Sequence, residues 1–115
     1  MSSKNPSAAV QLLRDFIAIP SVNPMDRSDI PKSVAGETRY AQAVHAELVT
    51  LGLDASLTGK GNRKSVIAEA SVRGATDTVL IASHLDTVPV DGMVIDPFDP
   101  QIEGDHLLGR GPGRG

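Results

Sequence analysis

The sequence predicts an α/β fold in which flanking helices accompany a partial mixed sheet. Two segments near the amino terminus repeat apolar residues with the 3.6-residue period of a helix, while residues 78–83 form an unbroken run rich in apolar and β-branched residues. Aromatic residues make up only 3% of the chain, so the core must be built from Val, Ile, Leu and Ala. Such a core favours a layered α/β domain.

The chain of 115 residues has room for one domain at most. Its hydrophobic content of 40% is too high for a disordered segment, and its charged content of 22% is too high for a membrane span. The formal charge is -3, from 11 basic and 14 acidic residues, and no cluster of Lys and Arg offers a surface for nucleic acid. We therefore expect a globular protein that binds neither nucleic acid nor membrane. Residues 1–10 lack the apolar stretch of a secretory signal, which makes the cytoplasm the expected location.

The first helix is expected from about Pro6 to Ala18. Asn5 precedes Pro6 as an N-cap precedes a proline at the first helical position, and Pro20 prevents the helix from continuing. Residues 21–36 contain two further prolines and several Ser and Asp residues but no periodicity, so they are expected to form a loop.

The second helix is expected between Glu37 and Gly52. Glu37 stands in its first turn, where the helix dipole stabilises a carboxylate, and Gly52 stands where a C-terminal cap is expected. His45 is expected to be a surface or boundary residue of this helix. The apolar positions follow the spacing i, i+4, i+8, i+11 at Tyr40, Val44, Leu48 and Leu51.

Two strands are expected at residues 53–57 and 65–70, joined by a basic, glycine-containing turn at residues 59–64. The apolar run 78–83 should be a third strand, central in the sheet and covered on both faces. Residues 71–77 carry turn chemistry, so the second and third strands are expected to form a hairpin, which would make the sheet mixed.

His84 and Asp86 follow directly on this expected buried strand, at the end where open α/β sheets place ligands and reacting groups. If residues 83–86 stay extended, side chains two positions apart lie on the same side within roughly 6.8 Å, so His84 and Asp86 face one site. A metal-binding imidazole needs its other ring nitrogen hydrogen-bonded, commonly by a carboxylate, which makes His84 the candidate ligand and Asp86 its support. On spacing alone, an ordinary strand-end histidine and an aspartate that caps the next turn are the commoner explanation.

Cysteine is absent, which excludes thiolate zinc sites, disulfides and a cysteine nucleophile. Any metal must therefore be held by carboxylates and by the three histidines, which are His45, His84 and His106. A small final hairpin is expected at residues 102–108 and places His106 beside Asp105. Carboxylates of the preceding loop offer a makeshift site with His106, although polar loop residues in water explain them more simply: they are Asp91, Asp96 and Asp99.

Four stretches of the chain carry a more specific signal than spacing alone. In chain order they are LLRDFIAIPSVNP (12–24), SHLDTVPV (83–90), DPF (96–98) and GDHLLGRG (104–111). Together they resemble the amino-terminal signature of the zinc aminoacylase/carboxypeptidase family of metallohydrolases, which includes acetylornithine deacetylase and succinyl-diaminopimelate desuccinylase. The residues at 90–93 and 101–104 lean toward the acetylornithine deacetylase branch.

The resemblance implies the amino-terminal part of a zinc-peptidase-like catalytic domain, so residues 1–115 are expected to form a single, incomplete portion without the lid and dimerisation domain. It implies that His84 binds one metal of a two-zinc centre, in which cobalt can substitute, and that Asp86 is the catalytic residue beside it. Arg114 stands where the family has the aspartate that bridges both metals, and a cation cannot bridge two zinc ions. The other ligands and the general-base glutamate lie downstream in relatives, so we expect at most weak zinc binding here.

By the same resemblance, a full-length relative hydrolyses the amide bond of an N-acyl amino acid or small peptide, as a deacetylase, desuccinylase or carboxypeptidase does. Many relatives are homodimers. This chain alone is expected to be inactive, and the departure at Arg114 predicts a truncated, frameshifted or deliberately shortened reading frame. The alternative is a non-catalytic α/β binding domain or a remnant fragment. The acyl group and the amino acid of the substrate stay open.

Overall fold

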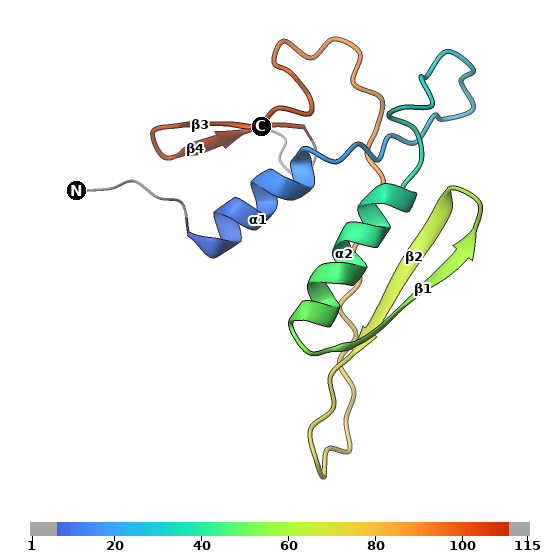
Figure 1. Ribbon diagram of the computed structural model, residues 1–115, viewed down its shortest axis with the longest axis vertical. Helices are drawn as coiled ribbons and strands as arrows, with labels where there is room; N and C mark the ends of the chain where they lie inside the picture. Colours follow the sequence, from blue (N-terminus) through green and yellow to red (C-terminus); the bar gives the residue numbers. More distant parts are fainter. Residues whose placement is uncertain (1–6, 111–115) are drawn as a thin grey trace.

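The computed structural model describes residues 7–110 of the chain. Helices and strands follow one another in the order α1 (Ala8–Ile17), α2 (Thr38–Thr50), β1 (Asp54–Lys60), β2 (Arg63–Glu69), β3 (Gln101–Glu103) and β4 (His106–Leu108) (Figure 1). The predicted α/β class is confirmed, because both helices and sheets are present. Neither helix within residues 7–110 has the length and apolarity needed to cross a membrane.

Helix α1 begins two residues later than predicted. Ser7 is extended and is the N-cap, since its side-chain oxygen accepts a hydrogen bond of 3.2 Å from the amide of Val10. The N-cap predicted at Asn5, with Pro6 at the first helical position, falls outside the described residues, and the helical turns begin only at Ala8. The side chain of Ser7 therefore satisfies one of the free amides of the first turn.

Helix α2 ends as predicted. Gly52 follows the C-cap residue with φ of 88° and donates its amide hydrogen to the carbonyl of Val49 at 2.9 Å, which is the left-handed ending that glycine favours. Glu37 is the N-cap residue but makes no side-chain cap bond. Its carboxylate instead lies 2.7 Å from Nε of Arg63, so an ion pair ties the start of α2 to the start of β2.

Strands β1 and β2 form an antiparallel hairpin in which Asp54 pairs with Glu69 and Lys60 pairs with Arg63. The two-residue loop Gly61-Asn62 has φ of 56° at its glycine, which suits the tight turns that connect strands of this twist. Helix α2 runs along the hairpin (Figure 1). The two expected strands are therefore confirmed, with a turn shorter than predicted.

Residues 78–83 are not a strand, which corrects the predicted central strand and its hairpin with β2. The exposed fractions of Val79, Leu80 and Ile81 are 85%, 86% and 91%, so this run lies in solvent. Both sheets among the described residues are two-stranded and antiparallel, not mixed. A strand buried on both faces needs neighbours along both edges and layers on both sides, and residues 7–110 place neither around this segment.

A backbone junction at Val22 connects the distant parts of the chain. Val22 pairs in parallel with Ala35 on one side and with Thr87 on the other. The amide of Val22 donates to the carbonyl of Val34 at 2.9 Å, and the amide of Thr87 donates to the carbonyl of Ser21 at 3.0 Å. Val22 is only 1% exposed and Ser21 is fully buried, so this junction lies in the core.

Arg110 connects the end of the described chain to helix α1. Its guanidinium donates to the carbonyl of Ile19, just beyond the helix, and lies 4.8 Å from the ring centroid of Phe98. Arg110 is only 5% exposed, and this burial lowers its pKa. Helices α1 and α2 meet nearby, where the rings of Phe16 and Tyr40 have centroids 5.4 Å apart.

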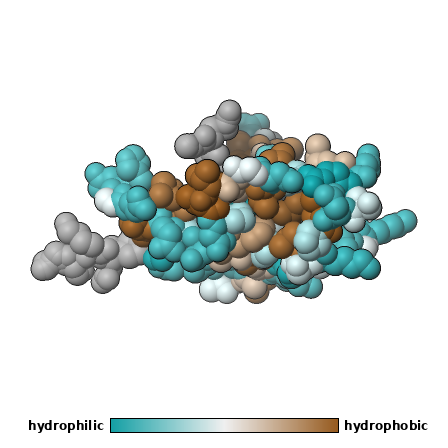
Figure 2. Space-filling view, turned by 90° about the horizontal axis from the view of Figure 1, so that it is seen from above, coloured by the Kyte–Doolittle hydropathy of each residue, from teal (hydrophilic) through white to brown (hydrophobic). Residues whose placement is uncertain are grey.

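The exposed run at residues 79–81 predicts self-association, because an unpaired extended segment is a template for another chain. Figure 2 shows further apolar atoms, in brown, at the surface of the face it views. We expect light scattering to detect oligomers, or a fluorescent dye for apolar surface to bind. Leu80→Lys should reduce both signals more than Val94→Lys, which places the same charge at a residue that is 98% exposed outside the run.

A monomer that binds no dye and unfolds cooperatively well above about 65 °C, the upper end of the usual range for domains from mesophiles, would contradict this expectation.

Candidate metal centre

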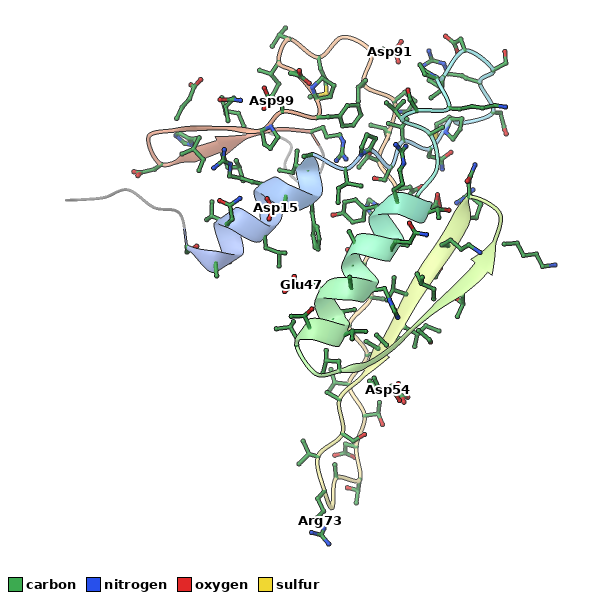
Figure 3. All side chains as sticks on the ribbon, in the orientation of Figure 1. Asp15, Glu47, Asp54, Arg73, Asp91 and Asp99 are labelled. Atoms are coloured by element: carbon green, nitrogen blue, oxygen red, sulfur yellow. The ribbon has the colours of Figure 1, made fainter. Side chains whose placement is uncertain are left out.

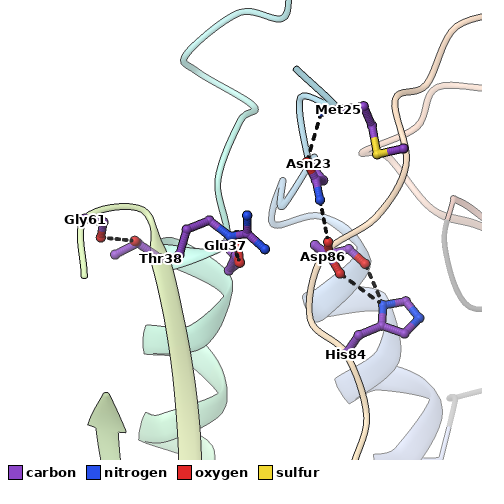
Figure 4. Close-up of polar contacts among 8 residues, drawn as sticks. Asn23, Met25, Glu37, Thr38, Gly61, His84 and Asp86 are labelled. Carbon is purple, nitrogen blue, oxygen red and sulfur yellow. Dashed lines mark hydrogen bonds and ion pairs between the residues drawn. The ribbon is translucent and has the colours of Figure 1, made fainter. Parts of the chain in front are cut away.

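His84 and Asp86 contact each other where the exposed run enters the backbone junction (Figure 4). Nδ1 of His84 lies 2.8 Å from the backbone carbonyl oxygen of Asp86 and 3.3 Å from Oδ1 of its carboxylate. Both neighbours are acceptors, so Nδ1 is the nitrogen that donates a proton. The lone pair of a neutral imidazole is then on Nε2, which is the arrangement a histidine ligand needs.

The carboxylate of Asp86 is also held from the opposite side. Nδ2 of Asn23 donates to Oδ2 of Asp86 at 2.9 Å, while Oδ1 of Asn23 accepts from the amide of Met25 at 3.0 Å. The pKa of Asp86 is lowered, mainly by the Asn23 hydrogen bond and further by a backbone hydrogen bond and the charges of His84 and Arg63, while burial opposes the shift. Asp86 is therefore an anion that lies 3.3 Å from a ring whose Nδ1 donates to the backbone carbonyl of the same residue.

The backbone junction explains why residues 63 positions apart meet here. The amide of Asn23 donates to the carbonyl of Thr87 at 2.8 Å, and the amide of Thr87 donates to Ser21. In the parallel pairing of Val22 with Thr87, Asn23 follows Val22 while Asp86 precedes Thr87, so their side chains project from the same face and meet diagonally. The loop predicted at residues 21–36 thus contributes directly to the candidate site.

A cavity of about 770 Å³ adjoins His84 and Asp86. Helices α1 and α2 form part of its wall, as does the segment that continues from the site. Burial raises the pKa of Tyr40 against the opposing charge of Arg110, so both polar groups are partly withdrawn from water. The remaining residues that line the cavity are Leu13, Ile17, Ser83, Leu85, Thr87, Val88, Pro89, Val90, Asp91 and Met93.

A second cluster of charges lies beside the site, at Arg27. Its guanidinium lies 2.8 Å from carboxylate oxygens of both Asp29 and Asp91, which joins the loop before α2 to the loop after the site. Hydrogen bonds from Arg27 lower the pKa of both carboxyls, and the two carboxylates raise the pKa of Arg27. Asp91 therefore has a cation as partner and does not turn toward a makeshift metal site.

The other candidate ligands do not join His84. Nε2 of His45 lies 3.2 Å from the carbonyl oxygen of Ala55, between α2 and β1. His106 begins β4 and is exposed, as is Asp105 in the preceding turn. Asp96 and Asp99 line a separate cavity of about 290 Å³ with Glu103; Figure 3 labels Asp91 and Asp99 on the stretch of chain after the site. Arg114 falls outside the described residues.

The described residues do not fit a complete metal site. Zinc sites use three or four protein ligands, and within residues 7–110 no group of three or more His, Asp or Glu side chains could hold an ion. His84 and Asp86 do contact each other, with Nδ1 of His84 facing the carbonyl and the carboxylate of Asp86. Sequence reasoning identified this pair but missed Asn23, whose position before a proline in a polar loop offers no signal of a partner 63 residues away.

The fold and the site together define a small α/β unit that carries one oriented histidine on the wall of a cavity. No family model matches the chain, and no solved structure matches it. It is similar to the succinyl-diaminopimelate desuccinylase of Bordetella avium (strain 197N), with 30% identity over 108 residues that cover 91% of this chain and 25% of that protein. It is also similar to the succinyl-diaminopimelate desuccinylase of Pelagibacter ubique (strain HTCC1062), with 27% identity over 108 residues, 89% of this chain and 25% of that protein.

The chain therefore spans about a quarter of the length of these curated relatives. The similarity extends over most of the chain and supports the predicted relationship to a hydrolase. Both proteins are desuccinylases by name, whereas residues 90–93 and 101–104 lean toward acetylornithine deacetylase.

The lowered pKa of Asp86 predicts acid sensitivity. The folded chain holds this proton less tightly than the unfolded chain does, so the stabilisation is fully present above the ordinary aspartate pKa of about 3.9 and is lost as the pH falls through the folded value. Carbon-13 NMR of the Asp86 carboxyl should give a lower midpoint in the native chain than in urea. Equal midpoints would show that the Asn23 contact does not stabilise the carboxylate.

Zinc should bind this chain only weakly, because His84 is a single ligand. We expect calorimetry to show no stoichiometric site with sub-micromolar affinity. His45→Ala provides a matched control, since His45 contacts a backbone carbonyl away from the site. Tight binding that is lost in His84→Ala but kept in His45→Ala would overturn this expectation and indicate an improvised site with His106 or the loop carboxylates.

Proposed function

We propose that this chain is the amino-terminal portion of the catalytic domain of a metal-dependent amide hydrolase. The observation that carries the proposal is the His84–Asp86 pair, with Nδ1 of the imidazole engaged at 2.8 Å and its Nε2 free of that contact. The similarity to two desuccinylases supports it, since it covers 89% and 91% of this chain. In this proposal His84 supplies one ligand to zinc, or to cobalt as a substitute.

The proposed reaction is hydrolysis of the amide bond of an N-acyl amino acid or small peptide. His84 would hold the metal, and Asp86 would keep the imidazole in the required tautomer. The remaining ligands and a general base are not found as a group within residues 7–110, so other parts of the whole protein would have to provide them. The whole protein would act on a small N-acyl amino acid, and it would form a homodimer as many relatives of the resembled family do.

A second candidate function applies to this chain when it stands alone. Within residues 7–110 no three metal-ligating side chains gather around one point, and this favours a non-catalytic α/β domain or remnant. The two candidates differ in one measurable respect: only the first needs His84 for activity once the remainder of a relative is attached.

The test exchanges the matched quarter of the Bordetella avium desuccinylase for this chain carrying Arg114→Asp, because a cation at that position cannot bridge two zinc ions. We expect the chimaera to hydrolyse N-succinyl-diaminopimelate with added zinc, and this activity to fall to background in His84→Ala. Asp86→Ala should weaken metal binding or activity by about 10- to 100-fold, as the loss of a supporting carboxylate does elsewhere. The 115-residue chain alone should remain at background.

His45→Ala in the same chimaera is the matched control and should keep its activity. Circular dichroism and thermal melting establish that each variant is folded. A folded chimaera that is inactive with zinc, or one whose activity survives His84→Ala, would favour the non-catalytic alternative.

A further inference from the structure

Asn23 is the side chain that connects the loop before α2 to the candidate centre. Its two polar groups have different partners: Nδ2 donates to Oδ2 of Asp86 at 2.9 Å, and Oδ1 accepts from the amide of Met25 at 3.0 Å. The amide hydrogen of Met25 can only be donated, so it fixes which way the Asn23 amide faces. The NH2 group is thereby turned toward Asp86 (Figure 4).

The two oxygens of the Asp86 carboxylate have separate contacts. Oδ2 accepts from Asn23, while Oδ1 lies 3.3 Å from Nδ1 of His84. A carboxylate held at one oxygen by a fixed donor cannot rotate freely about its terminal bond, so its other oxygen stays near the imidazole. An aspartate at position 23 would place two carboxylates together, and a leucine there would offer no donor. An asparagine meets both demands, as donor to Asp86 and acceptor from Met25.

The backbone holds Asn23 in place independently of its side chain. Its amide donates to the carbonyl of Thr87 at 2.8 Å, next to Asp86 in the chain. Met25 and Asp26 both have left-handed backbone conformations, with φ of 55° and 64°, and this turn returns the amide of Met25 to the Asn23 side chain. Non-glycine residues rarely adopt this conformation, so the surrounding contacts must maintain it.

We propose that Asn23 is a positioning residue that holds the carboxylate of Asp86 so that Asp86, in turn, holds His84 with Nδ1 protonated and Nε2 free. The effect on His84 is a property of this chain. Its consequence for metal binding rests on the proposed function, in which His84 is a ligand.

Arg27 provides a matched control for a role that is only structural. Arg27 joins the same two parts of the chain through its contact of 2.8 Å with Asp91, but it contacts neither Asp86 nor His84. If Asn23 merely ties the loop to the segment after the site, then loss of the Arg27 contact should disturb His84 to a similar extent. If Asn23 positions Asp86, only changes at Asn23 should do so.

The first experiment uses the metal-free 115-residue chain labelled with nitrogen-15, at about pH 8.5, two units above the ordinary histidine pKa. Imidazole nitrogen shifts report the tautomer of His84, which depends on the hydrogen bond at Nδ1. We expect the Nδ1-protonated form to predominate, and the two nitrogen shifts of His84 to move toward each other in Asn23→Leu. Arg27→Met should leave them unchanged, as should Asn23→Leu when it is combined with Asp86→Ala and compared with Asp86→Ala alone.

Asn23→Ser and Asn23→Ala form a second pair in case the leucine variant does not fold. The serine keeps a donor and should retain more of the Nδ1-protonated form than the alanine does. Equal tautomer populations in wild type, Asn23→Leu and Asn23→Ala, or equal effects of Asn23→Leu and Arg27→Met, would overturn the proposal.

The second experiment measures zinc affinity of the desuccinylase chimaera by competition with a chelator. Asn23→Leu should weaken binding by up to about 10-fold, the lower end of the effect of losing an outer partner of a ligand, while Arg27→Met should not. If zinc binds through His84 but Asn23→Leu changes neither affinity nor tautomer, the positioning role is wrong and the proposed function stands. If the tautomer responds to Asn23 but His84→Ala leaves zinc affinity unchanged, the positioning role stands and the proposed function is wrong.

Discussion

The order around the candidate centre depends on the parallel pairing of Val22 with Ala35 and Thr87. These pairings join three segments that are remote in the sequence, and they bury Ser21 and Val22 in the core. The start of α2 follows one partner, and the His84–Asp86 pair precedes the other. If Val22 did not pair with Thr87, no other backbone contact among residues 7–110 would bring Asn23 beside Asp86. A few backbone hydrogen bonds thus position the side chains of the site.

Polar contacts between segments complement a small apolar core. Arg27 joins Asp29 and Asp91, Glu37 joins Arg63, and Arg110 donates to the end of α1 while its guanidinium lies over an aromatic ring. The first two contacts are at least partly exposed, where solvent screens an ion pair and leaves it little net stabilisation. Their contribution is therefore mainly geometric, because each fixes the distance between two elements. Arg110 is different, since its cation is buried against carbonyl and ring.

The sequence was informative where structure depends on near neighbours. The cap at Gly52, the hairpin around its two-residue turn, and the closeness of His84 and Asp86 all follow from spacings of a few residues. The predictions from sequence failed where a residue depends on a partner that is distant in the sequence. The run at 78–83 has the composition of a buried strand, but a strand forms only beside another strand. No strand within residues 7–110 pairs with this run. Asn23 was missed for the same reason, since its partner is 63 residues away.

The candidate centre lies where the exposed run at residues 78–83 meets the backbone junction at Val22, so its two residues belong to different environments. The amides of residues 78–83 have no ladder partner within residues 7–110, so deuterium from solvent should enter them readily, whereas the amide of Thr87 is bonded inside the core. Asp86 adjoins the protected side, and the side chain of His84 is 83% exposed on the other. An ion that binds through His84 would restrict the motion of this unpaired segment. Its affinity would then include the conformational entropy that the segment loses, so ion binding and the ordering of residues 78–83 would be thermodynamically linked.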